Sequence, residues 1–303
     1  MTKYIKNIFQ KRSNPKGKAQ DEPTIPLKRI EAAKEITKPL EPNLSFEGKD
    51  QPEGKLSLEP SQLLASCAQS VGRQRDHNED SLYSLSTIFA SNGNRIPFGL
   101  YIVADGMGGH QHGEVASEIA CLTMAEYIMN QLYGHIMSIE PQPPEDPLRE
   151  ILQNGVNEAH SAILSHAPGG GTTLTCVVIM DNQMAIAHVG DSRVYSINLN
   201  GALKPLTRDH SLVKRLEELG QLTPEEAAIH PQRNVLYRAL GQGEPFDPEV
   251  ITAPTPESGY LLICSDGLWG VVPEKELGMI VKNTPTLHDA CQKMVDAANE
   301  AGG

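Results

Sequence analysis

The stretch YIVADGMGG, residues 101–109, is the part of the sequence on which the prediction of the fold depends. Its mostly apolar beginning leads directly into Asp105, and Gly106, Gly108 and Gly109 follow within four positions. A short apolar run bounded by glycine predicts a buried strand that ends abruptly. In isolation, Asp-Gly is more typical of a turn. A carboxylate at the end of a buried strand would nevertheless have a rigid support, and the glycines would let other groups approach its backbone.

The same arrangement recurs later in the chain. Asp191 and Asp266 also lie at the ends of apolar runs, one residue beyond them, and each is joined to a glycine. Glu79 and Asp80 add two further carboxylates ahead of the first of these strands. Carboxylates that converge at strand ends repel each other unless cations neutralise them. The pattern therefore predicts a cation site built from several strand ends.

The ligand chemistry narrows the choice of cation and reaction. Oxygen ligands suit Mg²⁺ or Mn²⁺ and disfavour zinc, which prefers histidine and cysteine. Two such ions, about 3.5–4 Å apart and bridged by one carboxylate, can hold and deprotonate a water for in-line attack. Arg75 precedes the acidic pair and offers a fork of donors that matches a phosphate. The combination favours phosphoester hydrolysis with Mn²⁺ or Mg²⁺ as the cofactor.

Composition bounds the remaining possibilities. The chain has 303 residues and a net charge of −12, so a nucleic-acid partner has no electrostatic support. Its five cysteines include no C-x-x-C pair, which indicates free thiols in a reducing cytosol. No apolar run approaches the about 18 residues of a membrane span, and the N-terminus lacks the apolar core of a secretory signal. We therefore expect a cytoplasmic protein without a transmembrane segment.

The charge is unevenly placed, and this predicts a division of the chain. Residues 1–60 carry a net charge of +3, whereas the remainder carries −15. Residues 1–20 are basic and could present a short apolar helical face to an anionic surface, but a disordered tail is favoured because the periodic stretch is so short. Prolines, lysines and glutamates dominate from there to residue 60. We predict a disordered tail and linker over residues 1–62 and a catalytic domain over residues 63–303.

Hydrophobic periodicity places the elements of that domain. Apolar runs predict strands at residues 63–71, 81–88, 98–104, 174–180, 184–189, 194–199 and 260–264. Steps of three and four predict helices at residues 115–132, 148–163 and 287–298. Residues 211–240 are expected to form a helix and an irregular segment, with a capping box at Thr223 and Glu226. Asp209 is interpreted as the N-cap of the helix in that segment.

Two further side chains are expected to support the site. Trp269 lies three residues after Asp266 and is interpreted as a packing anchor beneath that loop. Thr173 precedes a strongly apolar strand and is expected to form a hydrogen bond toward the site.

Six segments, taken in order, carry a resemblance to a known family. They are SVGRQRDHNEDS (70–81), YIVADGMGGHQHGEVAS (101–117), GGGTTLTCVV (169–178), AHVGDSRVY (187–195), LTRDHSL (206–212) and LLICSDGLWGVV (261–272). Each segment is weak evidence alone, but their order and spacing over residues 63–303 are highly specific. The chain resembles the type 2C metal-dependent serine/threonine protein phosphatases in their bacterial form.

The resemblance implies an α+β fold, a four-layer sandwich of two central, mainly antiparallel sheets flanked by helices. The metals would lie in a cleft at one end of the sandwich. Asp105 would bridge two metals, the Gly106 carbonyl would bind the second, and Asp266 would bind the first. Asp191 would contribute to a third, weaker metal site.

The resemblance also implies roles for residues beside the metals. Arg75 would bind the substrate phosphate, and Glu79 and Asp80 would hold metal-bound waters. Residues 211–240 would form a flap, a mobile segment beside the cleft in which substrate preference is tuned. The substrates would be phosphoproteins made by serine/threonine kinases, and the protein would be a monomer.

Two departures from the family pattern leave an alternative open. Some members have a histidine, a candidate general acid, where this chain has Met107. The family's last motif, Gly-Gly-x-Asp-Asn, supplies another ligand of the first metal and precedes a strand, but the sequence stops at Gly303. The alternative is a catalytically crippled regulatory domain that binds phosphoproteins. A hydrolase of small phosphoesters is a third possibility.

Overall fold

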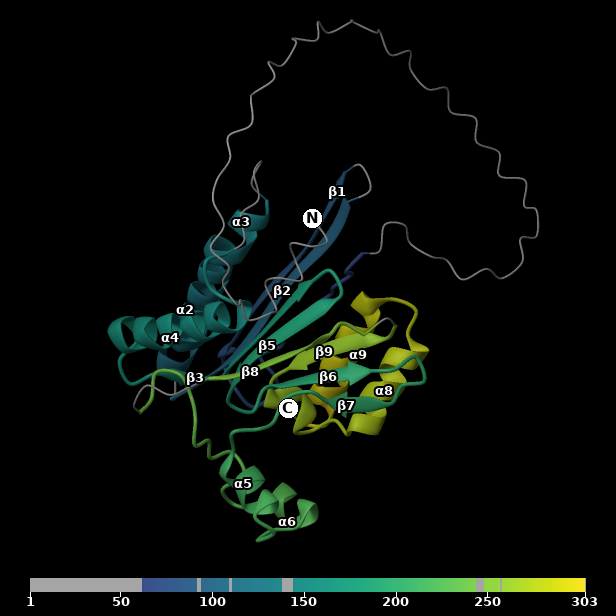
Figure 1. Ribbon diagram of the computed structural model, residues 1–303. Coiled ribbons are helices and arrows are strands. Elements are labelled where there is room, and N and C mark those ends of the chain that lie inside the picture. The colour runs from purple at the N-terminus through teal and green to yellow at the C-terminus, as the bar shows by residue number, and fades with distance from the viewer. Residues whose placement is uncertain are drawn as a thin grey trace, which may run out of the picture. The chain divides into compact units, whose positions relative to one another are not determined.

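The computed structural model describes residues 62–91, 94–108, 111–137, 144–243, 248–256 and 258–302 (Figure 1). The tail predicted over residues 1–62 falls outside these residues, apart from its last position. Among the described helices, none is both long and apolar enough to cross a membrane.

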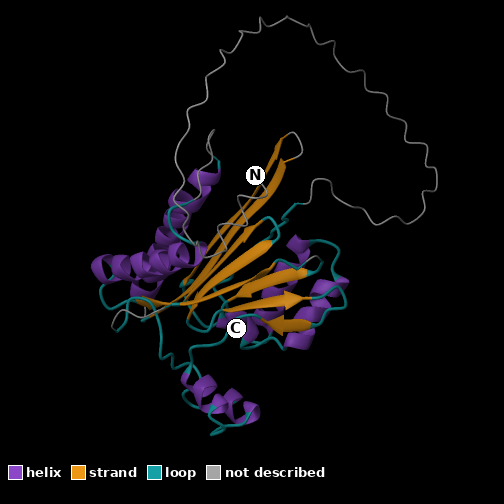
Figure 2. Cartoon of the chain, viewed as in Figure 1, coloured by secondary structure: helices purple, strands orange, loops and turns teal. Residues whose placement is uncertain are grey.

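A large antiparallel sheet contains six strands (Figure 2). Five of them follow the order β1-β2-β4-β5-β8, and the short β3 pairs with the end of β2. Their bounds are Asp80–Ser91 (β1), Asn94–Met107 (β2), Gly171–Thr172 (β3), Leu174–Met180 (β4), Gln183–Val189 (β5) and Glu249–Pro254 (β8). The predicted strands at residues 81–88, 98–104, 174–180 and 184–189 are confirmed.

A smaller antiparallel sheet has three strands in the order β7-β6-β9. They are Arg193–Ile197 (β6), Leu203–Pro205 (β7) and Tyr260–Cys264 (β9). The turn between β6 and β7 contains Gly201, whose φ of +86° is a conformation that glycine adopts without strain.

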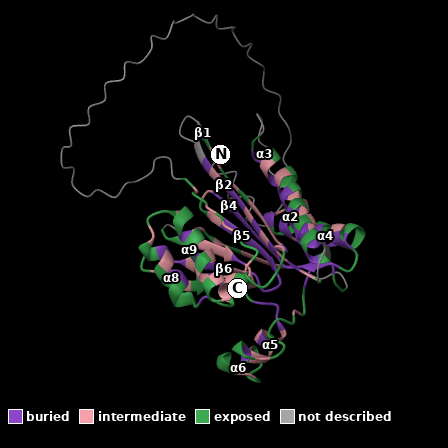
Figure 3. Cartoon of the chain, turned by 180° about the vertical axis from the view of Figure 1, so that it is seen from behind, coloured by how far each residue is buried: buried purple, intermediate pink, exposed green. Residues whose placement is uncertain are grey.

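Helices cover the outer faces of both sheets. In Figure 1, α2 and α4 lie over the large sheet, and α8 and α9 lie beside the small one. The bounds are Gln111–Ile128 (α2), the π-helix Met129–Tyr133, Gly134–Ile136 (α3), Leu148–His166 (α4), Leu212–Glu218 (α5), Pro224–Ala228 (α6), Asp266–Trp269 (α7), Glu274–Asn283 (α8) and Leu287–Glu300 (α9). The capping box of Thr223 and Glu226 is confirmed at the start of α6. The helices α5 and α6 stand apart from both sheets (Figures 1 and 3).

Three apolar clusters separate four layers, and β4 shows why. Cys176 and Val178 belong to the cluster shared with α2 and α4, whereas Val177 and Ile179 belong to the cluster between the two sheets. Successive side chains of a strand point to opposite faces, so a strand buried on both faces is apolar at nearly every position. Figure 3 shows this burial along the strands of the large sheet. The third cluster joins the small sheet to α8 and α9. The predicted four-layer α+β sandwich is confirmed.

The predicted strand at residues 63–71 is wrong: this segment pairs with no strand among the described residues. A strand needs a neighbour to satisfy its backbone groups. Here side chains hold the segment instead. Leu63 packs between the sheets, and the Ser66 carbonyl accepts a hydrogen bond from the Cys291 thiol. The Gln69 amide donates to the Asp80 carbonyl at 3.3 Å.

The second strand also differs from the prediction at its end. β2 does not stop at Asp105 but continues through Gly106 and Met107, which pair with Thr172 and Gly171 of β3. The two-residue strand β3 supplies partners for backbone groups that would otherwise be left without them. Asp105 is therefore held inside a sheet, which fixes its position more firmly than a strand end would.

Candidate metal and phosphate site

Four aspartates from separate elements converge at one end of the sandwich. Asp80 begins β1 and lies directly opposite Asp105 of β2 in the strand register. Asp191 lies in the turn between β5 and β6, and Asp266 begins α7 immediately after β9. Both sheets therefore contribute to the same acidic group, as the recurring strand-end aspartates predicted.

Burial and mutual repulsion perturb three of these carboxyl groups. Burial, reinforced by the negative charges of Asp80 and Asp266, raises the pKa of Asp105 well above its ordinary value. Burial also raises the pKa of Asp80, although the Ser265 hydroxyl donates to its Oδ2 at 2.8 Å and opposes this effect. Burial raises the pKa of Asp191 to about 7, with Asp266 and Asp209 adding to the shift.

Crowded carboxylates of this kind fit a hard divalent cation. Without positive charge nearby, each added negative charge disfavours the next, and a dication would offset that repulsion. The side chains provide oxygen and no sulfur, which suits Mg²⁺ or Mn²⁺. Among the described residues, no group of three or more histidine, cysteine, aspartate or glutamate side chains has an arrangement that could hold a metal ion.

Gly106 sits where no other residue fits. Its N–H donates to the Glu79 carbonyl at 3.1 Å. A Cβ at this position would lie 2.3 Å from the Gly113 carbonyl oxygen and 2.5 Å from the Glu79 carbonyl oxygen. The absence of a side chain therefore lets the start of α2 and the Glu79 backbone close against the strand beside Asp105.

Arg75 and Glu79 lie at the edge of the same region and form an ion pair with each other. The Arg75 side chain is 60% exposed, whereas that of Glu79 is only 8% exposed. Glu79 is thus fixed within the fold, and Arg75 can reach into solvent. Arg75, Glu79, Asp80, Asp105 and Asp266 all line a cavity of about 1070 Å³, and Asp191 does not.

Threonine hydroxyls and backbone groups form hydrogen bonds with the backbone of Asp105. The Thr173 hydroxyl accepts from the Asp105 N–H at 2.9 Å, and the Thr173 N–H donates to the Asp105 carbonyl at 2.9 Å. Thr172 donates its hydroxyl to the same carbonyl at 2.9 Å. Thr173 also bonds the Ser192 hydroxyl at 2.8 Å, next to Asp191. The predicted role of Thr173 is confirmed, whereas sequence reasoning missed Thr172 and Ser192.

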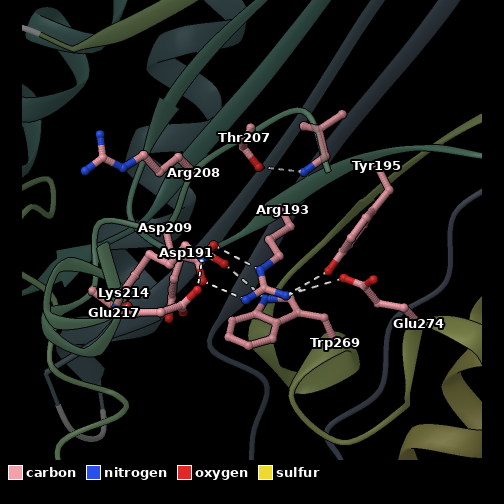
Figure 4. A network of polar contacts seen from close by, with 12 residues as sticks. Asp191, Arg193, Tyr195, Thr207, Arg208, Asp209, Lys214, Glu217, Trp269 and Glu274 are labelled. Atoms are coloured by element: carbon pink, nitrogen blue, oxygen red, sulfur yellow. Dashed lines mark hydrogen bonds and ion pairs between the residues drawn. The ribbon is translucent and has the colours of Figure 1, made fainter. Parts of the chain in front are cut away.

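Asp209 does not cap the helix that follows it, contrary to the prediction. Ser211 is the N-cap of α5, where its hydroxyl accepts from the Lys214 N–H at 3.3 Å. Asp209 is buried and paired with Arg193, with N–O distances of 2.9 and 2.7 Å (Figure 4). A buried carboxylate beside a guanidinium gains more from a bidentate pair than from capping an exposed turn. Trp269 packs with the apolar cluster of the small sheet, as expected.

Comparison with known sequences defines the class of this protein. A sequence profile described as "Protein phosphatase 2C" matches residues 65–302, which is most of the chain. The chain belongs to the protein phosphatase 2C family.

Particular members of the family are similar over most of their length. The "Serine/threonine phosphatase stp" of Listeria monocytogenes serotype 4b is 36% identical over 238 residues, covering 77% of this chain and 88% of the relative. The serine/threonine phosphatase of S. agalactiae superimposes with a TM-score of 0.65 at 31% identity, covering 78% of this chain and 93% of that structure. The catalytic domain of PstP, solved in complex with two manganese ions, gives a TM-score of 0.60 at 29% identity, covering 76% and 89%.

Proposed function

We propose that this protein is a metal-dependent phosphatase that hydrolyses phosphoserine and phosphothreonine in proteins. The observation that supports it best is the convergence of Asp80, Asp105, Asp191 and Asp266, with burial and repulsion raising the pKa of the first three. The similar proteins are named serine/threonine phosphatases, and one was solved with two manganese ions. Phosphorylated proteins are the substrates we expect, and we expect a monomer in the cytoplasm.

In this proposal, Asp105, Asp266, Asp191 and the Gly106 carbonyl would hold Mn²⁺ or Mg²⁺. The bound ions would supply an activated water and would neutralise charge on the phosphate. Glu79 and Asp80 would accept hydrogen bonds from water and so orient it. Arg75 would leave Glu79 and pair with two phosphate oxygens, for which its exposed position is suited. The thioether of Met107 cannot donate a proton to the leaving alcohol, so another group must do so.

The alternative, a non-catalytic domain that binds phosphoproteins, has less support. A domain that only binds phosphate would have no need of four clustered carboxylates, because these repel an anion unless cations are present. The names of the similar proteins also favour catalysis.

Release of phosphate from a phosphothreonine peptide tests the proposal. We expect turnover with Mn²⁺ or Mg²⁺, loss of turnover in EDTA, and recovery when excess Mn²⁺ is restored. Asp296→Asn, which alters an exposed carboxylate on α9, is the control and should hydrolyse the peptide at the normal rate. Full turnover in EDTA would contradict a metal-dependent mechanism. Tight peptide binding without turnover in Mn²⁺ would favour the non-catalytic alternative, and hydrolysis of para-nitrophenyl phosphate alone would favour small phosphoesters.

A further inference from the structure

Arg193, the first residue of β6, lies two positions after Asp191 and is outside the set of residues assigned above to metal or phosphate. We propose that Arg193 is a positioning residue that holds the turn of Asp191 and the start of α7 in place and joins both to the base of the flap (residues 211–240). The inference rests on the proposed function, because the positions that it fixes are those of the proposed metal ligands.

The guanidinium of Arg193 is held on every side (Figure 4). Its Nε and Nη2 donate to the two carboxylate oxygens of Asp209, and its Nη1 donates to the Tyr195 hydroxyl at 2.9 Å. Its central carbon lies 3.5 Å from the centre of the Trp269 ring, and Glu274 lies 4.0 Å from Nη1. A planar fork that stacks on a ring and binds a carboxylate with two parallel bonds is particular to arginine. A lysine could replace the charge but not the geometry.

The stacked ring connects Arg193 to two proposed metal ligands. Trp269 is the last residue of α7, the short helix that Asp266 begins. Its indole N–H donates to the backbone carbonyl of Asp191 at 3.0 Å. The position of the ring therefore fixes both the turn of Asp191 and the helix of Asp266. Arg193 stacks on the face of that ring through a cation–π interaction, whereas the N–H bond to Asp191 lies at the edge of the ring.

The carboxylate of Asp209 connects the same guanidinium to the flap. His210, the next residue, donates its N–H to the Gly190 carbonyl at 2.8 Å and accepts from the Gly190 N–H through Nδ1 at 3.2 Å. Gly190 has a φ of +105°, and a Cβ there would lie 2.5 Å from a Thr173 methyl carbon. The residue pair 209–210 is therefore docked tightly on the turn that carries Asp191.

Both ends of the flap meet at this docking point. The Tyr237 N–H donates to the His210 carbonyl at 2.9 Å, and the Leu212 N–H donates to the Val235 carbonyl at 2.8 Å. Helices α5 and α6 extend from this base and stand apart from the sheets (Figure 1). A displacement of the flap base would be transmitted through Asp209 to Arg193, and from there to Trp269 and Asp191. The same link operates in reverse when cations draw the aspartates together.

The test compares Arg193→Lys with Arg208→Lys in the whole protein. Arg208 is also an arginine at the flap base, but its side chain pairs with Glu218 at the surface. The first readout is the rise in melting temperature as Mn²⁺ is added without substrate. We expect Arg193→Lys to need about 10–100-fold more Mn²⁺ than the wild type for half of the rise, the scale of a lost partner of a metal ligand. We expect Arg208→Lys to match the wild type.

The second readout is the dependence of turnover on Mn²⁺ with para-nitrophenyl phosphate. For Arg193→Lys we expect kcat to fall at low Mn²⁺ and to recover at high Mn²⁺, with KM little changed. Trp269→Phe keeps the stacked ring but loses the donor to Asp191, so it should weaken Mn²⁺ binding as well. If both residues act through one connection, their losses of Mn²⁺ affinity should not multiply. The double variant should then need about as much Mn²⁺ as the more strongly affected single variant. Trp269→Phe also carries the test if Arg193→Lys does not fold.

The outcomes separate this inference from the proposed function. If Arg193→Lys has a lower melting temperature than the wild type in EDTA but a normal Mn²⁺ requirement, Arg193 is a purely structural residue and the inference is overturned. Wild-type protein that gains no stability from Mn²⁺ would overturn it too. A shifted Mn²⁺ requirement in Arg193→Lys, in a wild-type protein that hydrolyses no phosphopeptide, would support the inference and contradict the proposed function.

Discussion

Asp191 should make the metal-free protein less stable, and its replacement by asparagine should reverse this. Its carboxyl group has a pKa of about 7 in the fold and a usual value of 3.8. Because the folded pKa is raised, the folded protein holds more protons between these values, and stability falls as pH rises through them. The cost amounts to about 4 kcal/mol at pH 7.5 and about 2 kcal/mol at pH 5, since one pKa unit corresponds to about 1.4 kcal/mol.

Asp191→Asn keeps the size of the side chain and removes the charge. We expect the free energy of unfolding in EDTA to increase by up to about 4 kcal/mol at pH 7.5, and by less than half of that at pH 5. Urea unfolding at the two pH values measures both. Added Mn²⁺ should stabilise the wild type more than the variant, because only the wild type keeps the full ligand set.

The matched control for this experiment is Asp296→Asn. Asp296 is exposed on α9 and accepts a hydrogen bond from Gln292 on the same helix. Its replacement should change stability by no more than about 0.5 kcal/mol at either pH. A variant at position 191 that is less stable than the wild type in EDTA at pH 7.5 would refute the reasoning. An equal gain at both pH values would do so as well.

Three further predictions concern residues around the site. Burial and His210 lower the pKa of His188 to about 3, so the folded protein keeps it neutral and stability falls as pH drops below 6.5. When the pH is lowered from 7.5 to 5, the free energy of unfolding in urea should therefore fall by about 2 kcal/mol less for His188→Gln than for the wild type. Gly106→Ala should lower the melting temperature sharply, because its Cβ would lie 2.3 Å from a carbonyl oxygen, and an unchanged value would contradict the packing described. Arg75→Lys should lower kcat/KM for a phosphothreonine peptide, corresponding to a loss of about 1–3 kcal/mol in transition-state stabilisation. Equal kinetics would show that Arg75 is not part of the site.

The sequence predicted most of the fold because the decisive strands are buried on two faces or on one face with clear periodicity. Residues 174–180 are apolar apart from Thr175 because they lie between two layers, and α9 has its apolar residues in phase. The strand β8 was not predicted. Its residues are only half-buried or exposed at the edge of the sheet, so they lack a clear apolar run. Residues 63–71 have the composition of a strand, but composition cannot supply a neighbour to pair with.

The acidic centre was predictable because repetition of one local pattern carries information that a single Asp-Gly does not. Asp105, Asp191 and Asp266 were identified from strand ends and Asp80 from the acidic pair ahead of them, and the structure brings the four together. The residues that hold these aspartates in place were harder to predict from the sequence. Asp209 and Arg193 are 16 residues apart in the sequence, and local reasoning gave Asp209 to the nearest helix instead. A buried ion pair of this kind depends on two segments meeting in space, which no single window of sequence reveals.

Calorimetric titration of Mn²⁺ into the wild type and Asp105→Asn tests the central claim most directly. Asp105 is buried among the other aspartates, so its replacement removes the carboxylate at the centre of the group. We predict that the wild type binds at least two Mn²⁺ ions and that Asp105→Asn loses most of this binding. Hydrolysis of the phosphothreonine peptide should fall by more than about tenfold in the same variant. Equal Mn²⁺ binding and equal turnover in the two proteins would contradict the account.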